Sequence, residues 1–419
     1  MKSNKISTRK YPPGVTYEYE NEEGKEESKV IDFLNLTEET EVEEMVNRVM
    51  ETEEGVIKED ELRNAISELV QMKKDEKITK FEEHKSLNPH TLPLTNCAIN
   101  KNGDKIITGS YDRTCKVWDA ITGEQLQTFS GHKNVVYVLA FGGKDGHTIA
   151  TGSFDRTVKL WDSNTGELLH TLKGHTAEIV CLEFSSDGNL LATGAMDNMT
   201  KIWDVESGHE VCSFNEHSAE VVSVNFNTNG DKLLTGSFDN TAKIWDINTQ
   251  EIIHTLSGHN NEISCAKFDY AGEYCLTGSI DHTCKLWNVE TGDCIQTFSD
   301  HEDDILDACF NLVGSKIATS SGDRTTRIYN VLTGECLHVL EDHTSEVSNI
   351  RFNPQGTILA TARADSTCKL WSVESGELLQ TLDGHEDEIF SCHFNDNGDT
   401  IITGGKDNIC KIWKAETLT

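Results

Sequence analysis

The chain has 419 residues, of which 36% are hydrophobic and 26% charged, a composition typical of a folded globular protein with one large repeat array or two to three average domains. The formal net charge of -34 disfavours binding to the phosphates of nucleic acids or of anionic membrane surfaces, but it is compatible with basic protein partners. The start of the chain, MKSNKISTRKYPPG, has no apolar core of a signal peptide, and no apolar run approaches the length of a membrane span.

The first 75 residues carry no repeat and predict a small α+β module. Two alternating segments, GVTYEYE (14–20) and SKVIDFLNL (28–36), flank the turn sequence NEEGKE and predict a β-hairpin. Thr40 and Glu43 resemble a capping box at the start of a helix. Apolar residues then follow at helical spacing in two sets: Val42, Met45, Val46, Val49 and Met50, then Leu62, Ala65, Ile66, Leu69 and Val70. We therefore expect a ββαα domain over residues 1–75, which either caps the rest of the chain or binds a partner.

Residues 76–419 are repetitive, and their closing aromatic recurs at an interval of 43 residues once and of 42 residues six times. In the unit that ends near Trp203, apolar alternation predicts four strands, at 168–172, 178–184, 189–195 and 200–205. Units of about 40 residues with four strands are typical of propeller blades, so eight units predict an all-β, eight-bladed β-propeller. The recurring residues are His90, His132, His175, His217, His259, His301, His343 and His385; Asp112, Asp155, Asp197, Asp239, Asp281, Asp323, Asp365 and Asp407; and Trp118, Trp161, Trp203, Trp245, Trp287, Tyr329, Trp371 and Trp413.

The register of the units also predicts how the ring closes. The eighth unit lacks an outer strand because the chain ends soon after Trp413, whereas the segment KITKFEEH (77–84) precedes the first unit and has no place in it. We expect residues 77–87 to pair with the eighth blade as a latching strand, which would remove a free sheet edge.

The GH and WD signatures of each unit resemble the WD40 repeat family. The resemblance implies a hydrogen-bonded chain of four side chains inside each blade: the His, a Ser or Thr of the TGS segment, the Asp and the Trp. Each buried polar group then has a partner. The recurring residues are then structural rather than metal ligands or catalytic bases. The sixth unit departs from the pattern with Tyr329 and Asn330 in place of Trp-Asp, and we expect this blade to be looser.

The thirteen cysteines are odd in number and include no CxxC pair, which fits neither a disulfide framework nor a zinc ribbon. Four of them lie three residues after a recurring Asp: Cys115, Cys284, Cys368 and Cys410. Such equivalent placement indicates small buried apolar residues and a reducing compartment.

No motif of catalysis is present. The sequence contains no GxxxxGK[ST] phosphate loop, GxSxG elbow, HExxH helix or dinucleotide fingerprint. The neighbours Cys392 and His393 lie in a predicted strand, where adjacent side chains point to opposite faces. We therefore expect a binding protein with no catalytic residues, cofactor or metal.

Two sets of positions differ from blade to blade and are candidates for partner binding. The residue before each recurring Asp is large and apolar in five consecutive units, Tyr111, Phe154, Met196, Phe238 and Ile280, and then becomes Gly322, Ala364 and Lys406. An exposed apolar arc of this kind would mark an interaction surface. The alternative is that these side chains pack between blades.

The second set lies three residues after each recurring His, where the innermost strand begins. After Pro93 and Val135, six consecutive units carry an acid there: Glu178, Glu220, Glu262, Asp304, Glu346 and Glu388. Such a ring would focus a negative potential and favour a basic peptide, with Tyr137 and Phe390 as aromatic anchors two residues further along. The alternative is ordinary solvation of strand ends.

The whole chain resembles the family of dynein assembly factors with WD repeats. The residues that carry this resemblance are KYPPG and the YEYE hairpin, LPLTN (92–96), GSYDRTCK (109–116), GHKNVVY (131–137), GHTAEIVCL (174–182) and DEIFSC (387–392). The resemblance implies a non-enzymatic, monomeric adaptor that links preassembled outer-arm axonemal dynein to a subunit of the intraflagellar transport train. Its implied location is the cytoplasm and the cilium or flagellum, including the basal body and the axonemal cytoskeleton.

Two other classes remain open from the repeats alone. A ubiquitin-ligase substrate receptor often carries Arg three residues after the blade Trp, but here those positions hold Ile121, Asn164, Glu206, Asn248, Glu290, Leu332, Glu374 and Glu416. A chromatin reader would suit the acidic ring, but the chain has no basic nuclear-import cluster.

Overall fold

The computed structural model describes residues 3–9, 12–20, 26–34, 36, 40–52, 57–75, 78–88, 90–144, 146–341 and 345–417. The chain divides into two compact units, one of Met1–Lys80 with Ala415–Thr419 and one of Phe81–Lys414.

The smaller unit contains an antiparallel sheet in the order β1-β2-β3 and two helices. Its elements are β1 (Ser3–Arg9), β2 (Gly14–Glu20), β3 (Glu26–Asp32), α1 (Val42–Thr52) and α2 (Glu59–Asp75). The predicted hairpin and both helices are confirmed, but the ββαα prediction was incomplete because β1 adds a third strand. Its sequence, SNKISTR, has a single apolar residue and no alternation, so its pairing with β2 rests on backbone hydrogen bonds that leave no pattern in the side chains.

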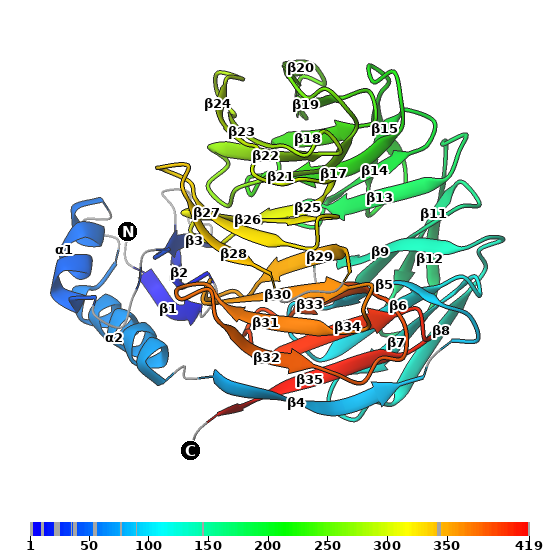
Figure 1. Ribbon diagram of the computed structural model, residues 1–419. Helices are drawn as coiled ribbons and strands as arrows, with labels where there is room; N and C mark the ends of the chain where they lie inside the picture. The colour runs from blue at the N-terminus through cyan, green and yellow to red at the C-terminus, as the bar shows by residue number, and fades with distance from the viewer. Residues whose placement is uncertain are drawn as a thin grey trace. The chain divides into compact units, whose positions relative to one another are not determined.

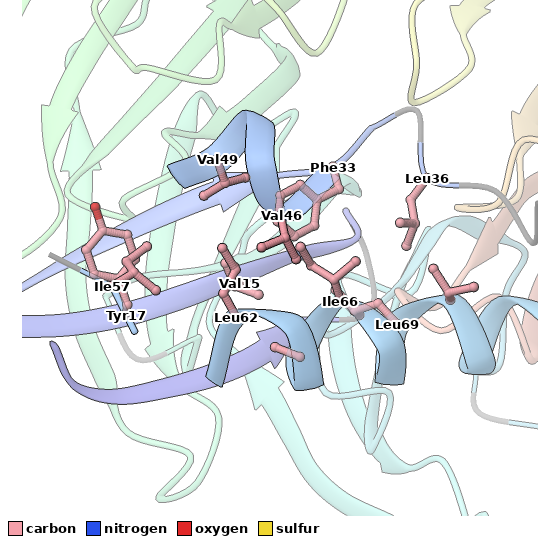
Figure 2. Close-up of a cluster of buried hydrophobic side chains, with 12 residues drawn as sticks. Val15, Tyr17, Phe33, Leu36, Val46, Val49, Ile57, Leu62, Ile66 and Leu69 are labelled. Carbon is pink, nitrogen blue, oxygen red and sulfur yellow. The ribbon is translucent and has the colours of Figure 1, made fainter. Parts of the chain in front are cut away.

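The core of this unit comes from the apolar faces of its helices and the middle strand (Figure 2). Val15 of β2, Val46 of α1 and Ile66 of α2 are each fully buried. Across the helices, Arg63 of α2 pairs with Glu43 of α1 at 2.7 Å. The 3.6-residue period of the helices therefore produces one buried stripe on each.

The larger unit consists of eight four-stranded antiparallel sheets, so the predicted eight-bladed propeller is confirmed (Figure 1). The first four sheets contain β5 (Leu94–Ile99), β6 (Lys105–Ser110), β7 (Thr114–Asp119) and β8 (Gln125–Ser130); β9 (Val136–Gly142), β10 (Thr148–Ser153), β11 (Thr157–Asp162) and β12 (Leu168–Lys173); β13 (Ile179–Phe184), β14 (Leu190–Ala195), β15 (Thr200–Asp204) and β16 (Glu210–Phe214); β17 (Val221–Phe226), β18 (Lys232–Ser237), β19 (Thr241–Asp246) and β20 (Ile252–Ser257).

The last four sheets contain β21 (Ile263–Phe268), β22 (Tyr274–Ser279), β23 (Cys284–Asn288) and β24 (Cys294–Phe298); β25 (Ile305–Phe310), β26 (Lys316–Ser321), β27 (Thr326–Asn330) and β28 (Cys336–Leu340); β29 (Val347–Phe352), β30 (Ile358–Arg363), β31 (Cys368–Ser372) and β32 (Leu378–Leu382); β33 (Ile389–Phe394), β34 (Thr400–Gly405), β35 (Cys410–Thr417) and β4 (Ile78–Leu87).

The ring closes between the eighth blade and the first. The innermost strands of successive blades lie beside one another, and β33 lies beside β5. The fourth strand of the eighth sheet is β4, which Figure 1 shows in blue alongside the red β35. Lys411 Nζ on β35 contacts Glu83 Oε2 of β4 at 2.8 Å, and the Gln380 side chain bonds both backbone groups of Phe81. The eighth sheet therefore joins two distant parts of the chain.

Candidate partner-binding surface

Each blade contains the same buried chain of polar side chains. In the second blade, His132 Nδ1 lies 2.9 Å from Asp155 Oδ2 and His132 Nε2 lies 2.8 Å from Thr151 Oγ1, which also accepts a hydrogen bond from Trp161 Nε1 at 2.9 Å. The corresponding His, Thr, Asp and Trp contacts recur in the first, third, fourth, fifth and eighth blades. His343 of the seventh blade lies outside the described residues. Both ring nitrogens of these His are thus occupied.

The protonation of the network follows from its geometry. The Asp carboxylate can only accept hydrogen bonds, which assigns the proton of the neutral ring to Nδ1, facing the Asp, and leaves His Nε2 to accept from the Thr hydroxyl. Burial lowers the pKa of His217, although Asp239 opposes this effect, and the imidazole stays neutral. Burial of Asp197 disfavours its charge, but hydrogen bonds from His175 and the Thr176 amide outweigh it and lower the pKa of Asp197 to about 2. The network therefore stabilises the blade and offers no free base.

Two blades depart from this arrangement. In the sixth, Thr319 Oγ1 contacts His301 at 2.8 Å, but the Tyr329 Oη is buried and has no hydrogen-bond partner among the described residues. In the seventh, Arg363 stands where five other blades have Ser; it is fully buried and its Nη1 lies 2.7 Å from Asp365 Oδ2. The polar interior of the ring is thus not equivalent in all blades.

The predicted apolar arc is exposed in part. Tyr111, Met196 and Phe238 are 43%, 41% and 36% exposed, whereas Phe154 and Ile280 are half-buried. Phe154 stacks on Tyr137 of its own blade, with ring centroids 4.9 Å apart. The alternative, packing between blades, therefore does not describe the three exposed members.

The structure joins the apolar arc and the acidic ring into one surface. In every blade the backbone N–H of the residue before the Asp donates to the carbonyl of the residue three after the His, as from Met196 to Glu178 and from Phe238 to Glu220, both at 3.0 Å. The same bond links Tyr111 to Pro93, Phe154 to Val135, Ile280 to Glu262, Gly322 to Asp304, Ala364 to Glu346 and Lys406 to Glu388. The sequence gives no sign that the two sets are adjacent, because this bond is made by backbone groups, which are the same in every residue. We call the combined set the arc surface.

Charge on the arc surface is unevenly distributed. Glu388 is partly compensated, since Lys406 Nζ lies 3.3 Å from its Oε2. His282 lies near Asp303 and Asp304, and ligand atoms of these three residues fall within 4.8 Å of one another. These groups are half-buried or exposed, and nothing else at this place indicates an ion.

An aromatic cavity of about 390 Å³ lies at the start of the innermost strands of blades eight, one, two and three. Tyr111, Tyr137 and Phe390 line it together with Val180. The predicted anchors Tyr137 and Phe390 therefore converge, because ring closure brings the eighth blade beside the first. Sequence reasoning missed Val180, although it lies five residues after a recurring His, as Tyr137 and Phe390 do.

These features define the chain as a WD-repeat β-propeller. Eight stretches match the family described as WD domain, G-beta repeat, at residues 81–119, 123–162, 166–204, 208–246, 250–288, 292–330, 334–372 and 376–414. Because they cover most of the chain, the protein belongs to this family. None of the helices in the described part of the chain is long and apolar enough to cross a membrane.

Particular relatives are similar over part of the sequence. The mouse protein named Dynein assembly factor with WD repeat domains 1 is 51% identical over 190 residues, 44% of this chain and 45% of that protein. The human protein of the same name is 50% identical over 190 residues, with the same coverage, and the zebrafish protein is 49% identical over 145 residues, 34% of each chain. Each match thus spans less than half of the relative's length. The crystal structure of the computationally designed Ika8 protein has a TM-score of 0.72 and 30% identity, covering 80% of this chain and 99% of that one.

Proposed function

We propose that this protein acts without catalysis as a cargo adaptor in the assembly of axonemal dynein, and that it links preassembled outer-arm dynein to a subunit of the intraflagellar transport train. The observation that carries the proposal is the identity of about half over 190 residues to relatives that are named dynein assembly factors. The proposed location is the cytoplasm and the cilium or flagellum, and the proposed state is a monomer that needs no cofactor.

The geometry of the repeats supports a binding role. In six of the eight blades, the recurring His, Thr, Asp and Trp bond to one another inside the sheet, so these residues stabilise the scaffold and are not available for chemistry. The features that vary between blades lie instead on the arc surface. Variation on a constant scaffold is how one fold supports specific binding.

We propose that the arc surface binds a segment of one partner that carries both apolar and basic side chains. The exposed Met196 and Phe238 lie next to the carboxylate-bearing residues Glu178 and Glu220 through the backbone bonds described above. Buried apolar anchors supply most of the affinity of an interface, while complementary charge raises the association rate. Nucleic acid and membrane lipid are disfavoured by the net charge of -34.

The test is quantitative affinity purification of the full chain from ciliated cells, with the wild type beside the double variant Met196→Glu, Phe238→Glu. The control is Leu332→Glu, which adds charge at a side chain that is 90% exposed and lies on a turn between the third and fourth strands of its blade. We expect the wild type and the control to recover outer-arm dynein and transport-train subunits, and the double variant to lose one of the two at least tenfold.

Two outcomes contradict these proposals separately. Recovery of histones or of ubiquitin-ligase subunits in place of dynein would refute the adaptor role. Normal recovery of both partners by a folded double variant would refute the arc surface as a binding site and leave the adaptor role intact.

A further inference from the structure

The central channel of the propeller has a second end, opposite the aromatic cavity. The fifth residue of each innermost strand lies toward that end: Ala98, Ala140, Glu183, Asn225, Lys267, Cys309, Arg351 and His393. A cavity of about 370 Å³ opens there in blades four to seven. Its lining includes Lys267, Cys309 and Arg351, with Phe226 and Phe268 from the ends of β17 and β21.

Arg351 is held in place in this cavity. Its Nη1 lies 2.7 Å from Asp307 Oδ2 and 2.6 Å from the carbonyl of Ile350. Asp307 Oδ2 also accepts from the backbone N–H of Ile350 and from Asn349 Nδ2, so the carboxylate is fixed in turn. Both contacts of the guanidinium use one nitrogen, and its remaining N–H groups have no acceptor among the described residues, so they can bind another one.

Lys267, two blades away from Arg351 around the ring, has no such partner. Its side chain is half-buried, and within the described part of the chain its ammonium makes no ion pair or hydrogen bond. Asp307 is the nearest channel carboxylate in the ring order, one blade away, but its Oδ2 is bonded by Arg351, Asn349 and the Ile350 amide. Glu183, two blades away, has both oxygens bonded by Asn225 Nδ2, at 2.9 and 2.8 Å. A partly buried ammonium without an acceptor is costly, and in a chain with a net charge of -34 an unpaired cation is unexpected.

Two acids near Lys267 are buried as well. Burial raises the pKa of Glu183, although the charge of Lys267 opposes this rise, and burial also raises the pKa of Asp269. Burial and the two cations lower the pKa of His393 to about 3, which keeps this imidazole neutral. The cavity therefore holds one cation that is fixed by its ion pair with Asp307 and one, Lys267, that has no ion pair within the described part of the chain.

We propose that this end of the channel binds a small molecule through an oxyanion, either a phosphate or a carboxylate group, which sits between Lys267 and Arg351. The guanidinium donates to the oxyanion as a fixed fork and the ammonium as a mobile point charge, a combination suited to either group. The volume of about 370 Å³ is within the range of small-molecule sites, and the phenylalanines at the rim supply apolar walls. This site is independent of the proposed dynein-related role.

The test is isothermal titration calorimetry of the full chain at low salt with pyrophosphate and, separately, with citrate. The variant is Lys267→Gln, and the matched control is Lys285→Gln, which removes the same charge from the third strand of the same blade, where Nζ bonds Thr297. We expect at least one of the two anions to bind the wild type and the control equally and the variant at least tenfold more weakly. Which anion binds distinguishes a phosphate from a carboxylate ligand. Failure of both anions to bind the wild type, or equal weakening by both substitutions, would overturn the proposal.

A second pair of variants keeps the proposal testable if Lys267→Gln does not fold. Cys309 lies between the two cations in the ring, so Cys309→Glu would place a carboxylate where the ligand is proposed to sit, and Cys309→Gln would place a neutral group of the same size there. We expect Cys309→Glu to have the higher Tm of the two and to abolish anion binding. An equal or lower Tm for Cys309→Glu would show that the cavity has no unmet positive charge and would refute the site.

Discussion

At the residue scale, the exchange of Trp for Tyr at position 329 removes one bond of the blade network. In the other blades the indole N–H donates to the Thr hydroxyl, as Trp161 does to Thr151 at 2.9 Å. Tyr329 is fully buried with its ring centroid 4.6 Å from that of Phe298, and its Oη has no hydrogen-bond partner among the described residues. That the sixth blade is looser than the others stays a prediction.

The hydroxyl that joins His to Trp gives a test of the network. We expect Thr151→Val to lower the free energy of unfolding by about 2 to 3 kcal/mol, because it leaves both His132 Nε2 and the Trp161 N–H without a partner. Thr319→Val in the sixth blade serves as a matched control and should cost less, since only His301 depends on that hydroxyl. Urea denaturation of both variants measures the difference. Equal losses would mean that the indole bond adds nothing.

At the scale of elements, the latching strand β4 is held by apolar packing as well as by ion pairs. Phe81 is 2% exposed, and its ring lies 6.3 Å from that of Phe394 in an edge-on arrangement. Lys411 adds contacts with Glu83 and with Ser86 Oγ at 2.9 Å. The strand therefore joins the eighth blade through its side chains and its backbone together.

Removal of the Phe81 ring should loosen this closure. We expect Phe81→Ala to lower the free energy of unfolding by about 3 to 4 kcal/mol, as large-to-small changes in a core do. Lys85→Ala, at an exposed position of the same strand, should change it by less than about 0.5 kcal/mol. Hydrogen exchange of β35 amides would report the loss directly: faster exchange in Phe81→Ala alone is expected, and unchanged protection would show that β4 is not needed for closure.

The elements also show which parts of the structure a sequence can reveal. The blades were predictable because a fixed 42-residue step places the same side chains in the same sheets, and the helices because their apolar residues recur with a 3.6-residue period. Strand β1 was not predictable, because its backbone pairing leaves no pattern in the sequence SNKISTR. The arc and the acids are joined by backbone bonds within each blade, which leave no pattern in the side chains. The proximity of Phe390 to Tyr137 required the closed ring, which no local pattern encodes.

At the scale of the whole molecule, the repeated network makes stability depend on pH. Burial lowers the pKa of four His of the network: His90, His217, His259 and His385. Hydrogen bonds lower the pKa of Asp197 and of Asp281 to about 2, because they outweigh the opposing effect of burial. In the unfolded chain these His bind protons near pH 6.5 and these Asp near pH 3.9. The unfolded state therefore binds more protons than the folded state on acidification, so the free energy of unfolding falls as the pH falls.

We expect the free energy of unfolding to be greatest between about pH 7 and pH 8, to decline from about pH 6.5 downward, and to decline again below about pH 4. Denaturant titrations across this range in 0.5 M salt measure it, because salt screens the repulsion among the excess acids that acidification would otherwise relieve. A rise in stability between pH 7 and pH 5 under these conditions would mean that the His of the network are protonated in the folded state.

The pairing of β4 with β35 has a consequence for the order of events during synthesis. Glu83 and Lys411 are 328 positions apart, so β4 leaves the ribosome before every other strand of the ring and β35 leaves after all of them. Each intermediate length of nascent chain holds finished blades but an open ring, with β4 and one blade face unpaired. Closure is therefore the final step of maturation, and a chain that stalls before β35 displays an unmatched strand that chaperones and proteases can distinguish from the finished ring.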